Sequence, residues 1–217
     1  MRVLIPFKAQ NPKTRLSGVM TLNERISIAE AMLYDVIQAV EKSGVDVIDI
    51  GVTKMNFVCK GIDTERVNII YAPYSLDDLV NDYLAKVVEH RGGEGVAVVM
   101  ADLPLLKAEH IKDIIEMGAE VVLAPGRFGG TNILFTSVPR KFRVSYYEMS
   151  FIKHFHKAEQ RGLTVKVYDS FYTSVDVDSP DDLVEVLLHS KGYAKEVLED
   201  MGFFLESNGA LVLLKRE

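Results

Sequence analysis

Residues 95–104, GVAVVMADLP, decide the fold of this chain. The run 95–101 is apolar almost throughout, which is typical of a central parallel strand that helices cover on both faces. Asp102 follows where this strand would emerge, and Pro104 then turns the chain away. A carboxylate at that place can bind a hard cation such as Mg²⁺. The equally favoured interpretation of Asp102 is a residue of an Asx-type turn.

Short apolar runs and helical stretches alternate on both sides of this strand. Strands are expected at 3–5, 46–52, 67–71, 120–124, 132–136, 164–168 and 172–177, and helices at 22–42, 76–89, 108–117, 150–161 and 179–188. The alternation predicts an α/β three-layer sandwich with a mostly parallel central sheet. Residues 203–214 carry an Asn-Gly pair between apolar runs, which predicts a β-hairpin. We expect one domain at 1–202 and a hairpin extension at 203–217, packed on that domain or on a partner subunit.

Composition excludes several classes of protein. The net charge of −6 argues against a nucleic-acid polymer as a partner. The single cysteine, Cys59, excludes an internal disulfide and a thiolate cluster for a metal, and we interpret it as a half-buried residue of a strand at 55–59. No apolar run is long enough for a signal-peptide core or a membrane span, so a cytoplasmic protein is expected.

A basic loop, 6–16 with the sequence PFKAQNPKTRL, leaves the first strand at its carboxyl end. Ligands of open α/β sheets bind outside the carboxyl ends of the strands. Lys8, Lys13 and Arg15 could therefore surround a polyphosphate through charge-assisted hydrogen bonds. A solvated basic loop is the alternative. The Walker motif GxxxxGK[ST] and the dinucleotide motif GxGxxG are both absent from the sequence.

An acidic segment, 174–183 with the sequence SVDVDSPDDL, supplies further carboxylates. In an extended strand Asp176 and Asp178 lie on the same side, about 7 Å apart, and at that spacing they can share a metal ion. Asp178 and Ser179 are competing candidate caps of the next helix, with Pro180 in its first turn. We interpret Asp181 and Asp182 as acids that complement the amino terminus of that helix.

A glycine-rich loop, 125–132 with the sequence PGRFGGTN, could bind an anion, because glycines let backbone N–H groups converge. Thr131 adds a hydroxyl, and an ordinary glycine-rich turn is the alternative. Ser150 is expected to cap a helix whose amino terminus can hold an anion. His154 and His156 do not share a face of that helix, so we interpret both as surface or half-buried residues rather than as metal ligands. The alternative is that one of them approaches the site.

The ordered set PFKAQNPKTRL, VVMADLPLL, GGTN, SFIKHFHKAEQRG and DVDSPDDL resembles the 2-phospho-L-lactate guanylyltransferase family of deazaflavin-coenzyme biosynthesis. The resemblance runs from Pro6 through Leu187. It implies the Rossmann-like fold of nucleotide-diphospho-sugar transferases. The implied reaction joins GMP from GTP to 2-phospho-L-lactate, or to a close acid such as phosphoenolpyruvate, and releases pyrophosphate. Mg²⁺ is the implied cofactor. Separately from the resemblance, the apolar content of the hairpin at 203–214 is compatible with a homodimer.

The resemblance also implies roles for single residues. The metal-binding carboxylates would be Asp102, Asp176 and Asp178. The residues that bind the acceptor would be Gly130, Thr131 and Ser150. The residues that bind the nucleotide and support catalysis would be Lys8, Lys13, Arg15 and Asp102. The chain departs from many members at Tyr147, where they carry glycine, and at 75–77, where Ser-Leu-Asp replaces Gly-Leu-Asn.

Three other functions remain open from the sequence. One is a nucleotidyltransferase of the same fold that uses a sugar phosphate or the molybdenum cofactor as acceptor. Another is a phosphatase that uses Asp176 and Asp178, and a third is a non-catalytic nucleotide-binding module. Phospholactate, phosphoenolpyruvate and phosphoglycerate differ by few atoms, so the sequence does not choose among them as acceptor.

Overall fold

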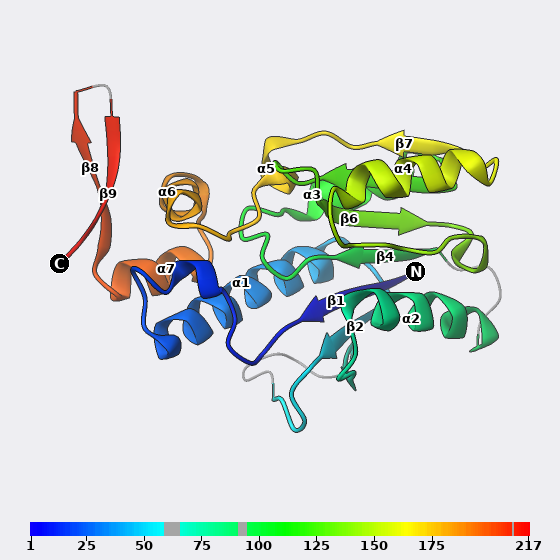
Figure 1. Ribbon diagram of the computed structural model, residues 1–217, viewed down its shortest axis with the longest axis horizontal. Helices are drawn as coiled ribbons and strands as arrows, with labels where there is room; N and C mark the ends of the chain where they lie inside the picture. Colours follow the sequence, from blue (N-terminus) through cyan, green and yellow to red (C-terminus); the bar gives the residue numbers. More distant parts are fainter. Residues whose placement is uncertain (59–65, 91–94, 210) are drawn as a thin grey trace.

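The computed structural model describes residues 1–58, 66–90, 95–209 and 211–217. These residues form a seven-stranded sheet in the order β3-β2-β1-β4-β6-β5-β7 (Figure 1). The strands are β1 Arg2–Phe7, β2 Val47–Val52, β3 Val67–Tyr71, β4 Val96–Val99, β5 Val121–Pro125, β6 Thr131–Thr136 and β7 Val165–Val167. β6 is antiparallel to β4 and β5, whereas the other neighbours are parallel. The mostly parallel sheet is therefore confirmed.

Helices cover both faces of the sheet. They are α1 Leu22–Lys42, α2 Leu76–His90, α3 Ala108–Glu116, α4 Ser150–Gln160, α5 Phe171–Ser174, α6 Pro180–His189 and α7 Tyr193–Asp200, with short 3-10 turns at Thr14–Leu16 and Pro139–Lys141. Apolar residues of α1, α3, α6 and α7 form one core with one face of the sheet. Residues of α2 and α4 form a second core with the opposite face. Successive strand residues alternate between the two cores, as Leu4 does between Val3 and Ile5, so the three-layer sandwich is confirmed.

Two strand predictions were wrong. The segment 172–177 is not a strand, because the one-turn helix α5 occupies its first part and 175–178 is coil that pairs with no strand of the described sheet. Residues 55–58 are turn and coil, and Asn56 adopts a positive φ of 58°, which is not a strand conformation. Cys59 itself lies outside the described residues.

Helix α7 was not predicted, and its amino terminus depends on a distant residue. The Asp35 carboxylate of α1 accepts hydrogen bonds from the backbone N–H groups of Tyr193 (2.7 Å) and Ala194 (2.9 Å). These are two of the N–H groups that a helix leaves without an internal partner. Burial raises the pKa of Asp35 to about 6, although the two backbone hydrogen bonds oppose that shift.

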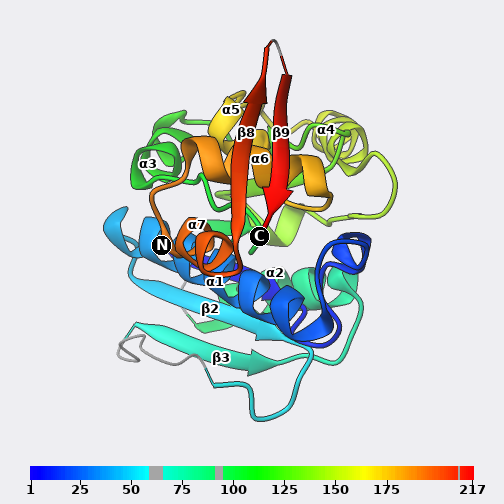
Figure 2. The same cartoon turned by 90° about the vertical axis from the view of Figure 1, so that its left-hand side faces the viewer.

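The predicted carboxyl-terminal hairpin is confirmed as β8 Phe203–Asn208 paired with β9 Leu211–Arg216. It forms a separate two-stranded sheet and projects from one end of the molecule (Figure 2). Arg216 ties its base to the domain by donating to the Val19 carbonyl (3.0 Å) and by pairing with Glu24. None of the described helices combines the length and the apolar character that crossing a membrane requires.

Candidate functional site

A cavity of about 620 Å³ lies at the carboxyl ends of β1, β2 and β4. Its wall includes the predicted residues Lys8, Lys13, Arg15, Asp102 and Asp178. This is the edge of the sheet at which ligands of open α/β folds bind. The structure therefore brings the basic loop to the carboxylate that follows the central strand.

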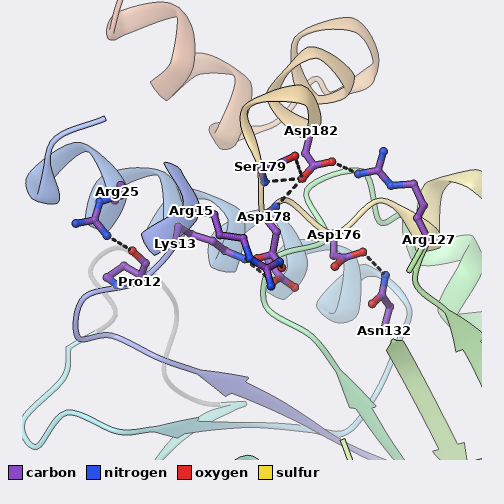
Figure 3. A network of polar contacts seen from close by, with 11 residues as sticks. Pro12, Lys13, Arg15, Arg25, Arg127, Asn132, Asp176, Asp178, Ser179 and Asp182 are labelled. Carbon is purple, nitrogen blue, oxygen red and sulfur yellow. Dashed lines mark hydrogen bonds and ion pairs between the residues drawn. The ribbon is translucent and has the colours of Figure 1, made fainter. Parts of the chain in front are cut away.

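Lys13 lies at the centre of this cluster. Its Nζ donates to Asp102 Oδ2 (2.5 Å) and to Asp178 Oδ1 (3.0 Å). Arg15 donates to Asp178 Oδ2 (2.9 Å), and Figure 3 shows Lys13 and Arg15 beside Asp178. Burial alone would lower the pKa of Lys13, but the charges and hydrogen bonds of the two carboxylates outweigh it and raise the pKa above its usual value. Lys13 is therefore a permanent cation between two acids that are 89 and 165 residues away in the sequence.

The basic loop needs an unusual backbone to present Lys13. Asn11 and Lys13 adopt positive φ angles of 43° and 50°. Arg25 of α1 holds the loop by donating to the Pro12 carbonyl (2.7 Å), as Figure 3 shows, and to Asn11 Oδ1 (3.1 Å). No local sequence motif indicates Arg25, because its buried position follows from the path of the loop.

The acidic segment is joined to the end of β4 through the backbone. The N–H of Val177 donates to the Asp102 carbonyl (3.1 Å), so Asp176 and Asp178 flank the residue that anchors them. Val175 and Val177 are fully buried, whereas the two aspartates are half-buried. The alternation expected of a strand is thus kept in coil, and it places the two carboxylates near Asp102.

Asp182 fixes the turn that carries Asp178. Its Oδ2 accepts from the backbone N–H groups of Asp178 (2.8 Å) and Ser179 (2.6 Å) and from the Ser179 hydroxyl (2.9 Å), while Oδ1 pairs with Arg127 (Figure 3). Burial would raise the pKa of Asp182, but these hydrogen bonds together lower it. Asp182 thus complements the amino terminus of α6, as predicted, and it also binds the backbone N–H of the site residue Asp178.

Of the three predicted metal-binding carboxylates, Asp176 is the one with no ion pair to a basic side chain within the described residues. Its Oδ1 accepts from Asn132 Nδ2 (3.3 Å), and its pKa is raised by burial first and then by the nearby charge of Asp102. Within the described residues, no three His, Cys, Asp or Glu side chains are arranged as a ready ligand set for a metal ion. The Lys13 ammonium instead lies between Asp102 and Asp178. The uncompensated charge of Asp176 fits an added cation, and the three-aspartate metal set stays a prediction.

The predicted acceptor-binding residues form a second, adjoining cluster. Ser150 Oγ donates to Thr131 Oγ1 (3.2 Å), and both residues are buried, with 1% and 3% of their surface exposed. Neither residue is part of the cavity wall described above. Asn132, which follows Thr131 in β6, contacts Asp176 and so joins this cluster to the acidic segment. The carbonyl of Gly130 accepts from the Gly126 N–H (3.0 Å) and closes the glycine-rich loop.

Ser150 is not the cap of α4, contrary to the sequence prediction. The capping position is Met149, and Ser150 is the first helical residue. Its hydroxyl points to Thr131 because the strand β6 offers that oxygen at hydrogen-bonding distance. Gly126 is needed beside this cluster, since a Cβ atom there would lie 2.7 Å from Asn132 Oδ1.

The interpretation of His154 as a surface or half-buried residue was wrong. Its side chain is fully buried, with Nδ1 2.9 Å from Thr131 Oγ1 and Nε2 2.8 Å from the backbone nitrogen of Ser145. The signal was the spacing from Ser150, because residues four apart share one face of a helix. His156 is exposed, as expected.

The two departures from the family pattern contact the same loop. Asp77 Oδ1 accepts from the backbone N–H of Tyr146 (2.6 Å), and the next residue, Tyr147, forms part of the cavity wall. Thr53 follows β2 at its carboxyl end and lines the same cavity, and its Oγ1 has no hydrogen-bond partner within the described part of the protein. A ligand can supply that partner, and no sequence motif indicated Thr53.

Known proteins share both the sequence and the fold. The sequence model of the family described as "Guanylyl transferase CofC like" matches residues 1–213. The 2-phospho-L-lactate guanylyltransferase of Methanoregula boonei is 40% identical over 98% of this chain and 94% of its own. That of Archaeoglobus fulgidus is 42% identical over 94% of this chain and 91% of its own.

Solved structures support the fold at low sequence identity. A nucleotidyl transferase from Methanothermobacter thermautotroptrophicus superposes with a TM-score of 0.61 at 10% identity, over 92% of this chain and 98% of that chain. A 4-diphosphocytidyl-2C-methyl-D-erythritol synthase gives 0.59 at 15% identity, over 86% of this chain and 96% of that chain. The fold is thus that of nucleotidyltransferases, and the sequence match shows that the chain belongs to the guanylyl transferase CofC-like family.

Proposed function

We propose that the protein transfers GMP from GTP to 2-phospho-L-lactate, or to a closely similar phosphorylated acid, and releases pyrophosphate. The observation that carries this proposal is the junction of Lys13 with Asp102 and Asp178 in the wall of one cavity. Relatives of about 40% identity over almost the whole chain bear the name of this activity. The proposal places the reaction in deazaflavin-coenzyme biosynthesis, in the cytoplasm.

The basic loop would hold the triphosphate. Lys8, Lys13 and Arg15 line the cavity and carry the positive charge that phosphate oxygens need. Lys13 stays charged because two carboxylates raise its pKa. As the α–β phosphoanhydride bond breaks, negative charge grows on the leaving pyrophosphate, and these side chains would stabilise it.

The acceptor would attack without a general base. A phosphate monoester is largely dianionic at neutral pH, since its second pKa is about 6. One of its oxygens forms the new bond to the α-phosphorus of GTP, and the bond to pyrophosphate breaks on the opposite side. Gly130, Thr131 and Ser150 would anchor this acid, and the contact of Asn132 with Asp176 places them next to the carboxylates.

Asp102, Asp176 and Asp178 would hold Mg²⁺. The raised pKa of Asp176, caused by burial and by the charge of Asp102, is the feature of this structure that fits such a cation. Bound there, the ion would neutralise phosphate oxygens and reduce the repulsion between the two anionic substrates. The Lys13 ammonium, which contacts both Asp102 and Asp178, would then be free to contact phosphate.

Guanine selectivity and assembly are further parts of the proposal. Gly51 and Thr53 line the cavity, and Thr53 Oγ1, which has no hydrogen-bond partner among the described residues, would bind the nucleobase. The projecting hairpin offers a surface for a second copy of the chain, in a homodimer.

One incubation series tests the proposed reaction. The purified protein is mixed with Mg²⁺, with each nucleoside triphosphate in turn, and with phospholactate, phosphoenolpyruvate, phosphoglycerate or a sugar phosphate; products are identified by mass. The expected product is the guanylylated phospholactate or its close analogue, together with pyrophosphate. Transfer to a sugar phosphate alone, hydrolysis of phosphomonoesters without nucleotide, or GTP binding without turnover would each contradict the proposal.

A further inference from the structure

A chain of buried hydrogen bonds runs from the backbone of Ser145 through His154 to Thr131. Ser145 N lies 2.8 Å from His154 Nε2, and His154 Nδ1 lies 2.9 Å from Thr131 Oγ1. His154 has no exposed surface, and Ser150, one turn earlier on the same face of α4, donates to the same Thr131 oxygen (3.2 Å). His154 and the predicted acceptor-binding pair therefore form one unit.

The backbone of Ser145 determines the tautomer of His154. A backbone N–H can only donate, so Nε2 must carry the lone pair, and the ring proton of the neutral imidazole lies on Nδ1. Burial, followed by the positive charges of Lys157 and Lys153, lowers the pKa of His154 to about 3. The imidazole is thus neutral at physiological pH, and its Nδ1–H donates to Thr131.

The hydrogen bonds of the Thr131 hydroxyl leave its own proton without an acceptor among the described residues. Its hydroxyl oxygen has two lone pairs, which accept from His154 and from Ser150. With Ser150 as the donor, the Thr131 O–H points away from both neighbours, and no hydrogen bond within the described part of the chain takes that proton. A hydroxyl fixed in this way is a ready donor to an anionic oxygen.

We propose that His154 is a positioning residue that directs the Thr131 hydroxyl proton toward an anionic oxygen of the acceptor acid. This inference rests on the proposed function and adds a residue to it. His154 does not touch the acceptor itself. Because it is neutral, it orients the donor without contributing a charge that would also attract GTP. Its loss should therefore weaken the use of the acceptor and leave the use of GTP unchanged.

Steady-state kinetics with matched variants test the proposal. In His154→Phe the aromatic volume is kept and both nitrogens are lost, and we expect the KM for the acceptor to rise about tenfold, the value of one hydrogen bond to a charged group. The KM for GTP should stay within about twofold. His154→Asn places an amide nitrogen near the position of Nδ1 and should recover part of the loss. His156→Phe, on the exposed side of the same helix, is the control and should behave as wild type.

A double-mutant cycle with Thr131→Val separates positioning from general support of the fold. If His154 acts through Thr131, the His154→Phe substitution adds almost nothing to the KM in the Thr131→Val background. Fully additive effects, or equal increases in the KM values of acceptor and GTP, would overturn the proposal. So would ¹⁵N spectra of the wild-type protein that place the ring proton on Nε2, a measurement that needs no folded variant.

The kinetic series also distinguishes this inference from the proposed function. A wild-type protein that transfers GMP to none of the acids overturns both. A wild-type protein that uses phospholactate, combined with an unchanged acceptor KM in a folded His154→Phe variant, overturns only the role of His154.

Discussion

Replacing Asp182 with asparagine should disturb the site without changing any residue that lines the cavity. Asp182 accepts hydrogen bonds from the N–H groups of Asp178 and Ser179 and pairs with Arg127. The asparagine has the same shape, but it has no charge, and its NH₂ group would face the guanidinium or the two backbone donors. Any orientation therefore leaves at least one donor opposite another donor.

The size of the effect follows from burial. Only 4% of the Asp182 side chain is exposed, whereas 31% of Arg127 is. Removing one partner of a buried ion pair costs about 3–5 kcal/mol, and the partial exposure of Arg127 favours the lower end, about 3 kcal/mol. In a chain of 217 residues this lowers the midpoint of thermal unfolding by about 6–12 °C. Because the turn also carries Asp178, kcat/KM should fall about tenfold or more in the folded variant.

The assay compares Asp182→Asn with Asp181→Asn, which changes the adjacent exposed acid. Urea unfolding gives the free energy, and pyrophosphate release below the unfolding range gives kcat/KM. Asp181→Asn should stay within about 0.5 kcal/mol of wild type. Equal stability and equal turnover of the two variants would refute the role given to Asp182.

Two predictions concern the stability of other parts of the fold. The unfolded chain protonates His154 below pH 6.5, but the folded chain does so only near pH 3, so stability falls as the pH drops through this window, by about 2 kcal/mol between pH 7 and pH 5. Urea unfolding at several pH values should show this loss of stability in wild type but not in His154→Phe. Asp35 titrates in both proteins, so its contribution cancels in the comparison. Parallel curves of unfolding free energy against pH would contradict the prediction. Gly192→Ala would place a Cβ atom against the Asp35 carboxylate and should cost about 1–3 kcal/mol. Gly18→Ala, which has open space, is the control, and a Gly192→Ala melting temperature no lower than that of the control would contradict the packing described.

The central strand and its terminal carboxylate could be predicted because both follow from local sequence. An apolar run that ends at an aspartate specifies a buried strand and a charge at its end, and β4 with Asp102 has this arrangement. The basic loop could be located for the same reason. Its detailed path could not, since the positive φ of Lys13 depends on Arg25, which holds the loop from α1.

Three of the errors share one physical cause, which is contact between residues distant in sequence. Helix α7 begins where Asp35 accepts its first N–H groups, and no local pattern reveals that partner. The segment 172–177 alternates like a strand, yet Val177 bonds to the Asp102 carbonyl instead of joining the sheet. His154 is buried because Thr131 and Ser145 supply partners from outside α4.

The central claim is that Asp102 and Asp176 act in one catalytic site with the basic loop. Pyrophosphate release by purified Asp102→Asn and Asp176→Asn, with GTP, Mg²⁺ and phospholactate at saturation, tests it most directly. We predict that turnover falls by about 10²-fold or more in each variant while both variants stay folded under the assay conditions. Near-normal pyrophosphate release from either folded variant would contradict the claim.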